Sequence, residues 1–149
     1  MEPTVFNERV RGKKQICFII DDDNGEKFGF YMNSKMMEIY PSFSIKADIQ
    51  SFHFNLQSKN NRLSKPMKFE INDSYDICAL TFRSNTLMVR LGDIYLYKQN
   101  SCKSFCCQNK HNFNYHSISK ALCGKSHHPF YTYNKEKFVP TRILVIQMK

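Results

Sequence analysis

The sequence of 149 residues contains no tryptophan, and glycine and proline occur only five times each. A collagen-like or low-complexity chain needs far more of both. With 42% hydrophobic and 14% aromatic residues, the chain has enough apolar side chains for a core, and a domain of this length buries roughly 70% of its unfolded surface. We therefore expect one globular domain over residues 1–149.

Long hydrophobic runs are also missing. The longest, residues 16–20 and 143–146, are far shorter than the about 20 residues that a membrane-spanning helix needs. Residues 1–14 are polar and charged, unlike a secretory signal. We expect no membrane span and a cytoplasmic or nuclear location, in which the six cysteines stay reduced.

Acidic residues are scarce in the second half of the chain. Residues 76–149 contain 11 basic and 3 acidic side chains, whereas residues 1–75 contain 11 basic and 10 acidic ones. The net charge of +9 is therefore a local property of the second half, and it calls for an acidic partner to be considered.

Short β-type runs separated by turn residues begin at residue 15. Residues 15–20 and 27–32 flank Asn24-Gly25, a pair that favours a tight hairpin turn through positive φ angles. The aspartates before this turn do not form an EF-hand. When Gly25 is aligned with the glycine at the sixth position of that calcium loop, Ile20 falls at the first position, where a carboxylate is needed. We expect a β-hairpin without a calcium site.

The next segments also alternate with the period of a strand. Residues 51–56 place three apolar side chains on one face and the polar ones on the other, which predicts a half-buried strand. Residues 33–49 lack clean periodicity and predict a long connection. We expect the following strands to form a meander: 67–71, 77–82, 87–91 and 94–97.

The last third of the chain has a different character. Residues 98–136 are rich in Asn, Ser, Lys, Cys and His and predict irregular segments around the sheets. Residues 138–148 predict a long terminal strand whose apolar part, 143–146, we expect to be buried on both sides. Many short strands with few helices predict a mainly β fold, a two-sheet antiparallel β-sandwich with a few short peripheral helices.

The order of these segments resembles the TLDc domain of the oxidation-resistance proteins. The resemblance covers about residues 4–148, and the divergent TLDc-like proteins of amoebae are the most similar, at residues 5–9 and 28–31. Two departures are Thr86–Leu91, in place of a glycine-rich run, and Leu144, in place of an acidic residue; the N-terminal helical part is also short. The matching segments are Phe28-Gly29-Phe30, residues 51–56, Gly92-Asp93-Ile94-Tyr95-Leu96, Ser101-Cys102, the region of Tyr115, and Phe138–Ile146.

This resemblance implies a β-sandwich and a function in oxidative-stress protection. For some family members it also implies binding to the vacuolar proton pump. It implies no catalytic residue and no cofactor, so we expect a non-enzymatic domain that acts by protein–protein interaction. The chain itself shows no nucleophile motif, because no base and oxyanion-loop sequence accompany its Cys and His residues.

A cluster of cysteine and histidine is the densest group of potential ligands. Cys102, Cys106, Cys107 and His111 are ligand types that suit tetrahedral zinc, but the spacing is not that of a zinc knuckle. The neighbouring lysines could instead lower a thiolate pKa and make Cys106 or Cys107 sensitive to oxidants. Free thiols without either role are our default expectation.

The alternative function is binding of nucleic acid. Lysines neutralise phosphates and aromatic side chains stack on unpaired bases, and both kinds interleave near the end of the basic region. Against it, the chain has no recognised nucleic-acid-binding signature. The candidate residues are Lys125, His127, His128, Tyr131, Tyr133, Lys135 and Lys137.

Overall fold

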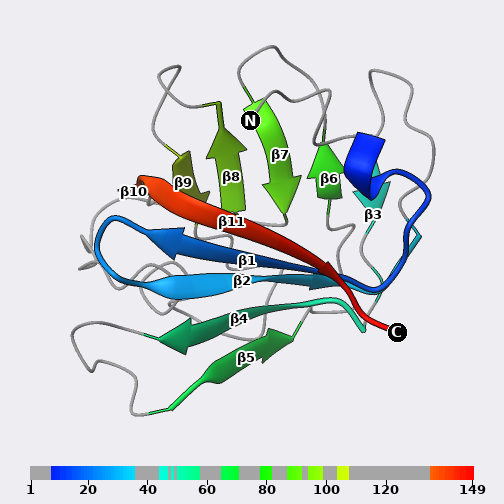
Figure 1. The fold of residues 1–149 in the computed structure, drawn as a ribbon, viewed down its shortest axis with the longest axis horizontal. Coiled ribbons are helices and arrows are strands. Elements are labelled where there is room, and N and C mark those ends of the chain that lie inside the picture. Colours follow the sequence, from blue (N-terminus) through cyan, green and yellow to red (C-terminus); the bar gives the residue numbers. More distant parts are fainter. Residues whose placement is uncertain are drawn as a thin grey trace.

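The computed structural model describes part of the chain. The described residues are 8–35, 44–46, 48, 50–57, 65–70, 78–81, 87–91, 94–98, 104–107 and 135–149. For residues 44–46, 78–81, 87–88, 105–107 and 135–137 only the backbone is described. The fold is mainly β, with antiparallel sheets and one helical turn at residues 8–10 in the described part (Figure 1).

Five strands form the largest sheet, in the order β11-β1-β2-β4-β5. They alternate in direction, and β11, the last strand of the chain, lies beside β1, the first (Figure 1). The bounds are Ile16–Asp22 for β1, Lys27–Met32 for β2, Phe52–Gln57 for β4, Met67–Glu70 for β5 and Pro140–Gln147 for β11.

The remaining strands form two smaller sheets. A four-stranded sheet has the order β10-β9-β8-β7, and a two-stranded sheet pairs β3 with β6. The predicted meander is therefore wrong from β5 to β7, because β5, β6 and β7 belong to three different sheets; its last pair, β7 and β8, is confirmed. The bounds are Ser44–Lys46 for β3, Cys78–Thr81 for β6, Leu87–Leu91 for β7, Ile94–Tyr97 for β8, Ser104–Cys107 for β9 and Lys135–Phe138 for β10.

The β1–β2 hairpin is confirmed, but its turn differs from the expected one. Gly25 alone supplies a positive φ, of 78°, and the loop has three residues, closed by a bond from the Asp22 N–H to the Glu26 carbonyl at 3.1 Å. A type I turn followed by a left-handed glycine has this form. The Asp22 Oδ1 stabilises it by accepting from the N–H groups of Asn24 and Glu26 at 2.8 and 2.9 Å.

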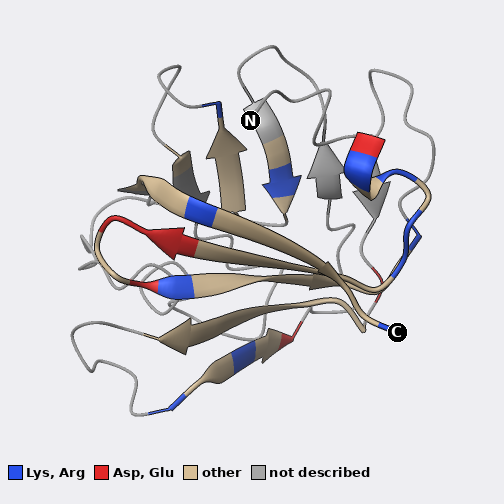
Figure 2. Ribbon diagram, viewed as in Figure 1, with Lys and Arg blue, Asp and Glu red and all other residues tan. Residues whose placement is uncertain are grey.

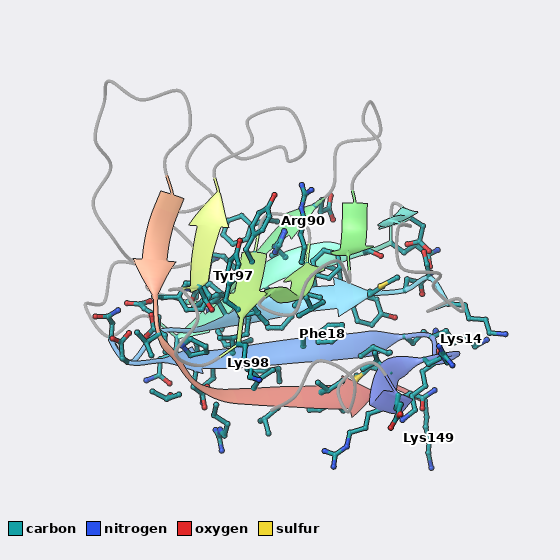
Figure 3. All side chains as sticks on the ribbon, turned by 90° about the horizontal axis from the view of Figure 1, so that it is seen from above. Lys14, Phe18, Arg90, Tyr97, Lys98 and Lys149 are labelled. Carbon is teal, nitrogen blue, oxygen red and sulfur yellow. The ribbon has the colours of Figure 1, made fainter. Side chains whose placement is uncertain are left out.

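The core includes one face of the five-stranded sheet. Phe18, Phe28 and Phe30 are completely buried there, and Figure 3 shows Phe18 on the side of β1 that faces the four-stranded sheet. The ring of Phe28 meets that of Phe138, at the end of β10, edge to face with centroids 5.1 Å apart. The four-stranded sheet contributes further buried residues: Val89, Leu91, Ile94, Leu96 and Ser104.

Strand β4 reverses the polarity that its sequence predicts. His53 and Asn55 are buried, at 0% and 1% exposure, as is Phe54 at 7%, whereas Leu56 is 40% exposed. The His53 ring packs on Phe30 with centroids 4.8 Å apart. Burial lowers the pKa of His53 to about 3, outweighing a hydrogen bond to the Gly29 backbone, which acts in the opposite direction. The polar face of β4 is therefore the one turned into the core.

Two expectations about the rest of the chain are also wrong. Residues 44–46 form β3 within the predicted connection, and the predicted irregular region 98–136 contains β9, at residues 104–107, and the start of β10, at residues 135–138. These three strands have only three or four residues each, too few for an alternating pattern to appear in the sequence. Residues 36–43 and 108–134 lie outside the described part.

Candidate functional site

The most distinctive surface of the described structure is the outer edge of β11. This strand has eight residues and pairs with β1 on one side, while no described strand pairs with its other side. Leu144, Val145 and Ile146 are 38%, 40% and 44% exposed. The expectation that residues 143–146 are buried on both sides is therefore wrong, because the strand closes one edge of the sheet instead of crossing its centre.

The ladder to β1 shows which backbone groups of β11 face outward. The Met148 N–H donates to the Gln15 carbonyl at 2.8 Å, and the register pairs Ile146 with Cys17. In an antiparallel pair, every second residue exchanges bonds with the neighbouring strand, so Ile146 faces β1 with its N–H and C=O groups. Val145 then directs its N–H and C=O to the open edge, as do Ile143 and Gln147.

Negative charge on the β1–β2 hairpin neutralises the one charged side chain of β11. The Arg142 Nε and Nη2 atoms lie 2.7 and 2.6 Å from Asp21 Oδ2, and Lys27 Nζ lies 3.3 Å from Asp21 Oδ1. Desolvation raises the pKa of Asp21, but hydrogen bonds and charge attraction from Arg142 and Lys27 outweigh it, and the net pKa is lowered. The edge therefore presents apolar residues with no uncompensated charge between Pro140 and Gln147.

The two ends of β11 carry opposite charge. At its start, Asp23 is exposed and accepts a bond from the Val139 N–H at 3.2 Å. At its end, exposed basic residues of the chain before β1 lie beside exposed Lys149, as Figures 2 and 3 show. The basic residues of this end are Arg9, Arg11, Lys13, Lys14 and Lys149.

The outer face of the five-stranded sheet continues the apolar surface of β11. Tyr31 and Phe52, both half-buried, stack with ring centroids 5.0 Å apart, and Lys68 Nζ lies 4.6 Å from the Phe52 ring centre. Phe54 lies across Gly29, where an added Cβ would come 2.7 Å from Phe54 Cζ. An aromatic layer therefore covers the centre of this face.

The predicted cysteine cluster is only partly described. Cys102 and His111 lie outside the described residues, whereas Cys106 and Cys107 are consecutive residues of β9. Cys106 is opposite Glu136 and Cys107 is opposite Lys135 in the register. Within the described part of the chain, no group of three His, Cys, Asp or Glu residues could hold a metal ion.

The residues predicted to bind nucleic acid are also only partly described. Lys135 and Lys137 belong to β10, while Lys125, His127, His128, Tyr131 and Tyr133 lie outside the described residues. The sheet adds positions that the sequence did not indicate. Reading across β7 to β10, one register row contains Arg90, Tyr95, Phe105 and Lys137.

This row lies on the side of the four-stranded sheet opposite to its core. Ile94 and Leu96 alternate with Tyr95 and are completely buried, and residues directly across a ladder share a face. Arg90 Cζ lies 4.9 Å from the centre of the Tyr95 ring. Figure 3 shows Arg90 on the side of its sheet that faces away from the five-stranded sheet.

Sequence reasoning did not identify the edge of β11 as a site. Pro140 was the available signal, because proline is confined to edge strands, first strand positions and bulges. It is the first residue of β11, at the register shift opposite Asp22. The apolar run at 143–146 outweighed that signal and suggested a central strand.

No protein-family model matches this chain, and no curated protein matches it at a significant level of similarity. None of the helical segments in the described residues has the length and apolar character to cross a membrane.

Proposed function

We propose that this chain is a non-enzymatic protein-interaction domain that binds an extended segment of a partner along β11. The observation that carries the proposal is the outward-facing backbone of Ile143, Val145 and Gln147 on an exposed apolar strand. Such an edge is a template for strand addition, in which main-chain hydrogen bonds give affinity and alternate side chains give specificity.

Beyond the proline and the register shift at its start, β11 lacks the usual protection of an open edge, and this supports the proposed function. Sheet proteins usually guard an open edge with lysines, inward-pointing charges or a very short strand. Here the strand has eight residues, and its one charged side chain, Arg142, is held by Asp21 at 2.6 Å. An edge of this kind is consistent with a surface that a partner covers.

The resemblance to the TLDc domain supplies the biological setting of the proposal. It suggests a two-sheet sandwich, to which the five-stranded and four-stranded sheets would correspond, and a cytoplasmic or nuclear partner. The vacuolar proton pump and the machinery of oxidative-stress protection are the partners that the resemblance favours.

A proline exchange at two neighbouring positions tests the proposal. Val145→Pro removes an N–H that faces the open edge, so the sheet should stay intact while strand addition is blocked. Ile146→Pro is the matched control, because it removes an N–H that faces β1 and should destabilise the fold through the loss of a ladder hydrogen bond. Circular dichroism and urea unfolding distinguish these two effects.

The functional readout is an affinity pull-down from the native cells with wild-type and Val145→Pro baits, with and without nuclease. We expect proteins that the wild type retains, regardless of nuclease, to be lost with folded Val145→Pro. Retention of the same proteins by both baits would contradict binding at β11.

Binding of single-stranded nucleic acid is the second candidate function. The row of Arg90, Tyr95, Phe105 and Lys137 supports it, because it places two basic and two aromatic residues across one face of a sheet. Single-strand binding combines these two residue types, cations for the phosphates and rings for the bases.

Fluorescence anisotropy with labelled oligonucleotides across a salt series tests this second function. Affinity should fall steeply with salt, and Tyr95→Ala should weaken binding by about 1–3 kcal/mol. Tyr31→Ala, on the outer face of the other sheet, is the control and should have no effect. Equal binding by wild type and Tyr95→Ala would contradict a role for the row.

A further inference from the structure

We infer that the segment received by β11 is β11 of a second copy of this chain, paired antiparallel across a two-fold axis. The inference rests on the proposed function of the open edge and names its partner. The resulting dimer would join two five-stranded sheets into one continuous sheet.

The geometry of the edge limits the registers of this pairing. The groups that face outward belong to Ile143, Val145 and Gln147, and bonded residues of an antiparallel pair lie opposite each other. An axis at Leu144 places Ile143 opposite the second copy's Val145 and Thr141 opposite its Gln147. This register uses almost the whole strand and keeps each apolar face continuous across the junction.

The charges at the two ends of β11 match in this arrangement. The same register brings Val139 opposite the second copy's Lys149, and the Val139 N–H is held by the Asp23 carboxylate at 3.2 Å. The acidic turn of one copy therefore meets the basic end of the other, which also contains Lys13 and Lys14. The two-fold symmetry repeats this contact at both ends.

Within one copy these charges cannot meet. Val139 and Lys149 are at opposite ends of a strand that rises about 3.4 Å per residue, which separates them by roughly 30 Å. The overall charge of +9 opposes association, but salt screens exposed charges beyond about 8 Å at physiological ionic strength. Salt therefore weakens the repulsion between distant parts of the two copies more than the attraction between the charges that meet at the ends of β11.

A charge-swap experiment tests the inference. Lys14→Glu/Lys149→Glu reverses charge at the basic end that meets Asp23 of the other copy, and Asp23→Lys reverses the charge that meets Lys149. Each variant should weaken self-association at least about tenfold, whereas a 1:1 mixture should form a heterodimer, because every contact again joins opposite charges. Analytical ultracentrifugation of wild type, single variants and mixture measures the dissociation constants.

Matched controls separate local from general effects of charge. Lys65→Glu/Lys68→Glu makes the same change in net charge at β5, the opposite edge of the sheet, and should leave the dimer unchanged. Val145→Pro should yield a folded monomer. If Asp23→Lys proves unstable by urea unfolding, the Lys14→Glu/Lys149→Glu variant paired with its β5 control still decides the matter.

The outcomes distinguish this inference from the proposed function. A wild-type chain that stays monomeric at all concentrations, a Val145→Pro variant that still forms dimers, or a mixture that does not associate would overturn the dimer. If the wild type is monomeric but Val145→Pro loses other proteins in the pull-down, the proposed function stands and the second copy is the wrong partner.

Discussion

Asp23 and Val139 are joined by two hydrogen bonds although 116 residues separate them in the sequence. The Asp23 N–H donates to the Val139 carbonyl at 2.9 Å, and the Val139 N–H donates to Asp23 Oδ1 at 3.2 Å. This pair fastens the β1–β2 turn to the junction between β10 and β11. It thereby sets where the exposed edge strand begins.

Replacing Asp23 should loosen this junction. Asp23→Ala leaves the Val139 N–H without its acceptor and should lower the free energy of unfolding by about 1 kcal/mol. Asp23→Asn retains an acceptor oxygen and should have a smaller effect. Urea unfolding measures both, and equal losses in the two variants would show that the acceptor is not what stabilises the junction.

The close packing at Gly29 predicts a large effect of one methyl group. A Cβ there would lie 1.9 Å from the Phe18 carbonyl oxygen, and this backbone cannot move without breaking the β1–β2 ladder. Gly29→Ala should cost about 3 kcal/mol or more of stability. Gly12→Ala is the control: its Cβ meets nothing within 4 Å at a φ of +72°, and it should cost only about 1–2 kcal/mol. Similar losses would contradict the steric explanation.

The buried His53 predicts that stability depends on pH between about 6.5 and about 3. Burial lowers its pKa to about 3 in the folded state, whereas the unfolded chain has a pKa of about 6.5. The unfolded state therefore binds more protons in this window, and stability falls as the pH falls, by on the order of 2 kcal/mol at pH 5.

The test of this effect is the change in the free energy of unfolding with pH, rather than its value at one pH. His53→Asn should be less stable than wild type at pH 7 but should lose little more between pH 7 and pH 5. Urea unfolding at both pH values gives the comparison. A variant with the full wild-type slope would place the titrating group elsewhere.

The Arg142–Asp21 pair predicts that removing Arg142 changes the pKa of Asp21. Desolvation alone raises the pKa of Asp21, and Arg142 and Lys27 together reverse that effect. Arg142→Ala should therefore raise the pKa of Asp21, as measured by NMR titration of its carboxyl carbon. Lys68→Ala, which removes a cation on β5, should leave that pKa unchanged, and an equal shift in both variants would contradict the local pair.

The thiols should differ in their response to mild peroxide. Burial raises the pKa of Cys17, which disfavours its reactive thiolate, so we expect it to stay unmodified. We expect modification at Cys106 or Cys107, the two residues of β9 that the sequence predicts to be sensitive to oxidants. Mass spectrometry after treatment tests this order, and unmodified Cys102, Cys106 and Cys107 would remove the redox hypothesis.

The candidate sites depended only partly on patterns visible in the sequence. Lys135 and Lys137 were selected for their charge, but the ladder decided that Lys137 shares a row with Arg90. Arg90 lies 45 or more residues away from both lysines in the chain, so no local spacing could indicate this row. The edge of β11 was missed for another reason: Pro140 was a local signal of an edge, but the apolar run at 143–146 suggested a central strand.

The sequence by itself determined where most described strands lie and the hairpin of β1 and β2, because alternation and turn residues act over a few neighbours. Tertiary structure decided which strands are partners and which faces are buried. His53 is inside because β4 sits beside β2 with its polar face toward the core, and residues 143–146 are exposed because β11 has β1 on one side only. Burial depends on every element packed around a strand, and a local pattern contains no information about those neighbours.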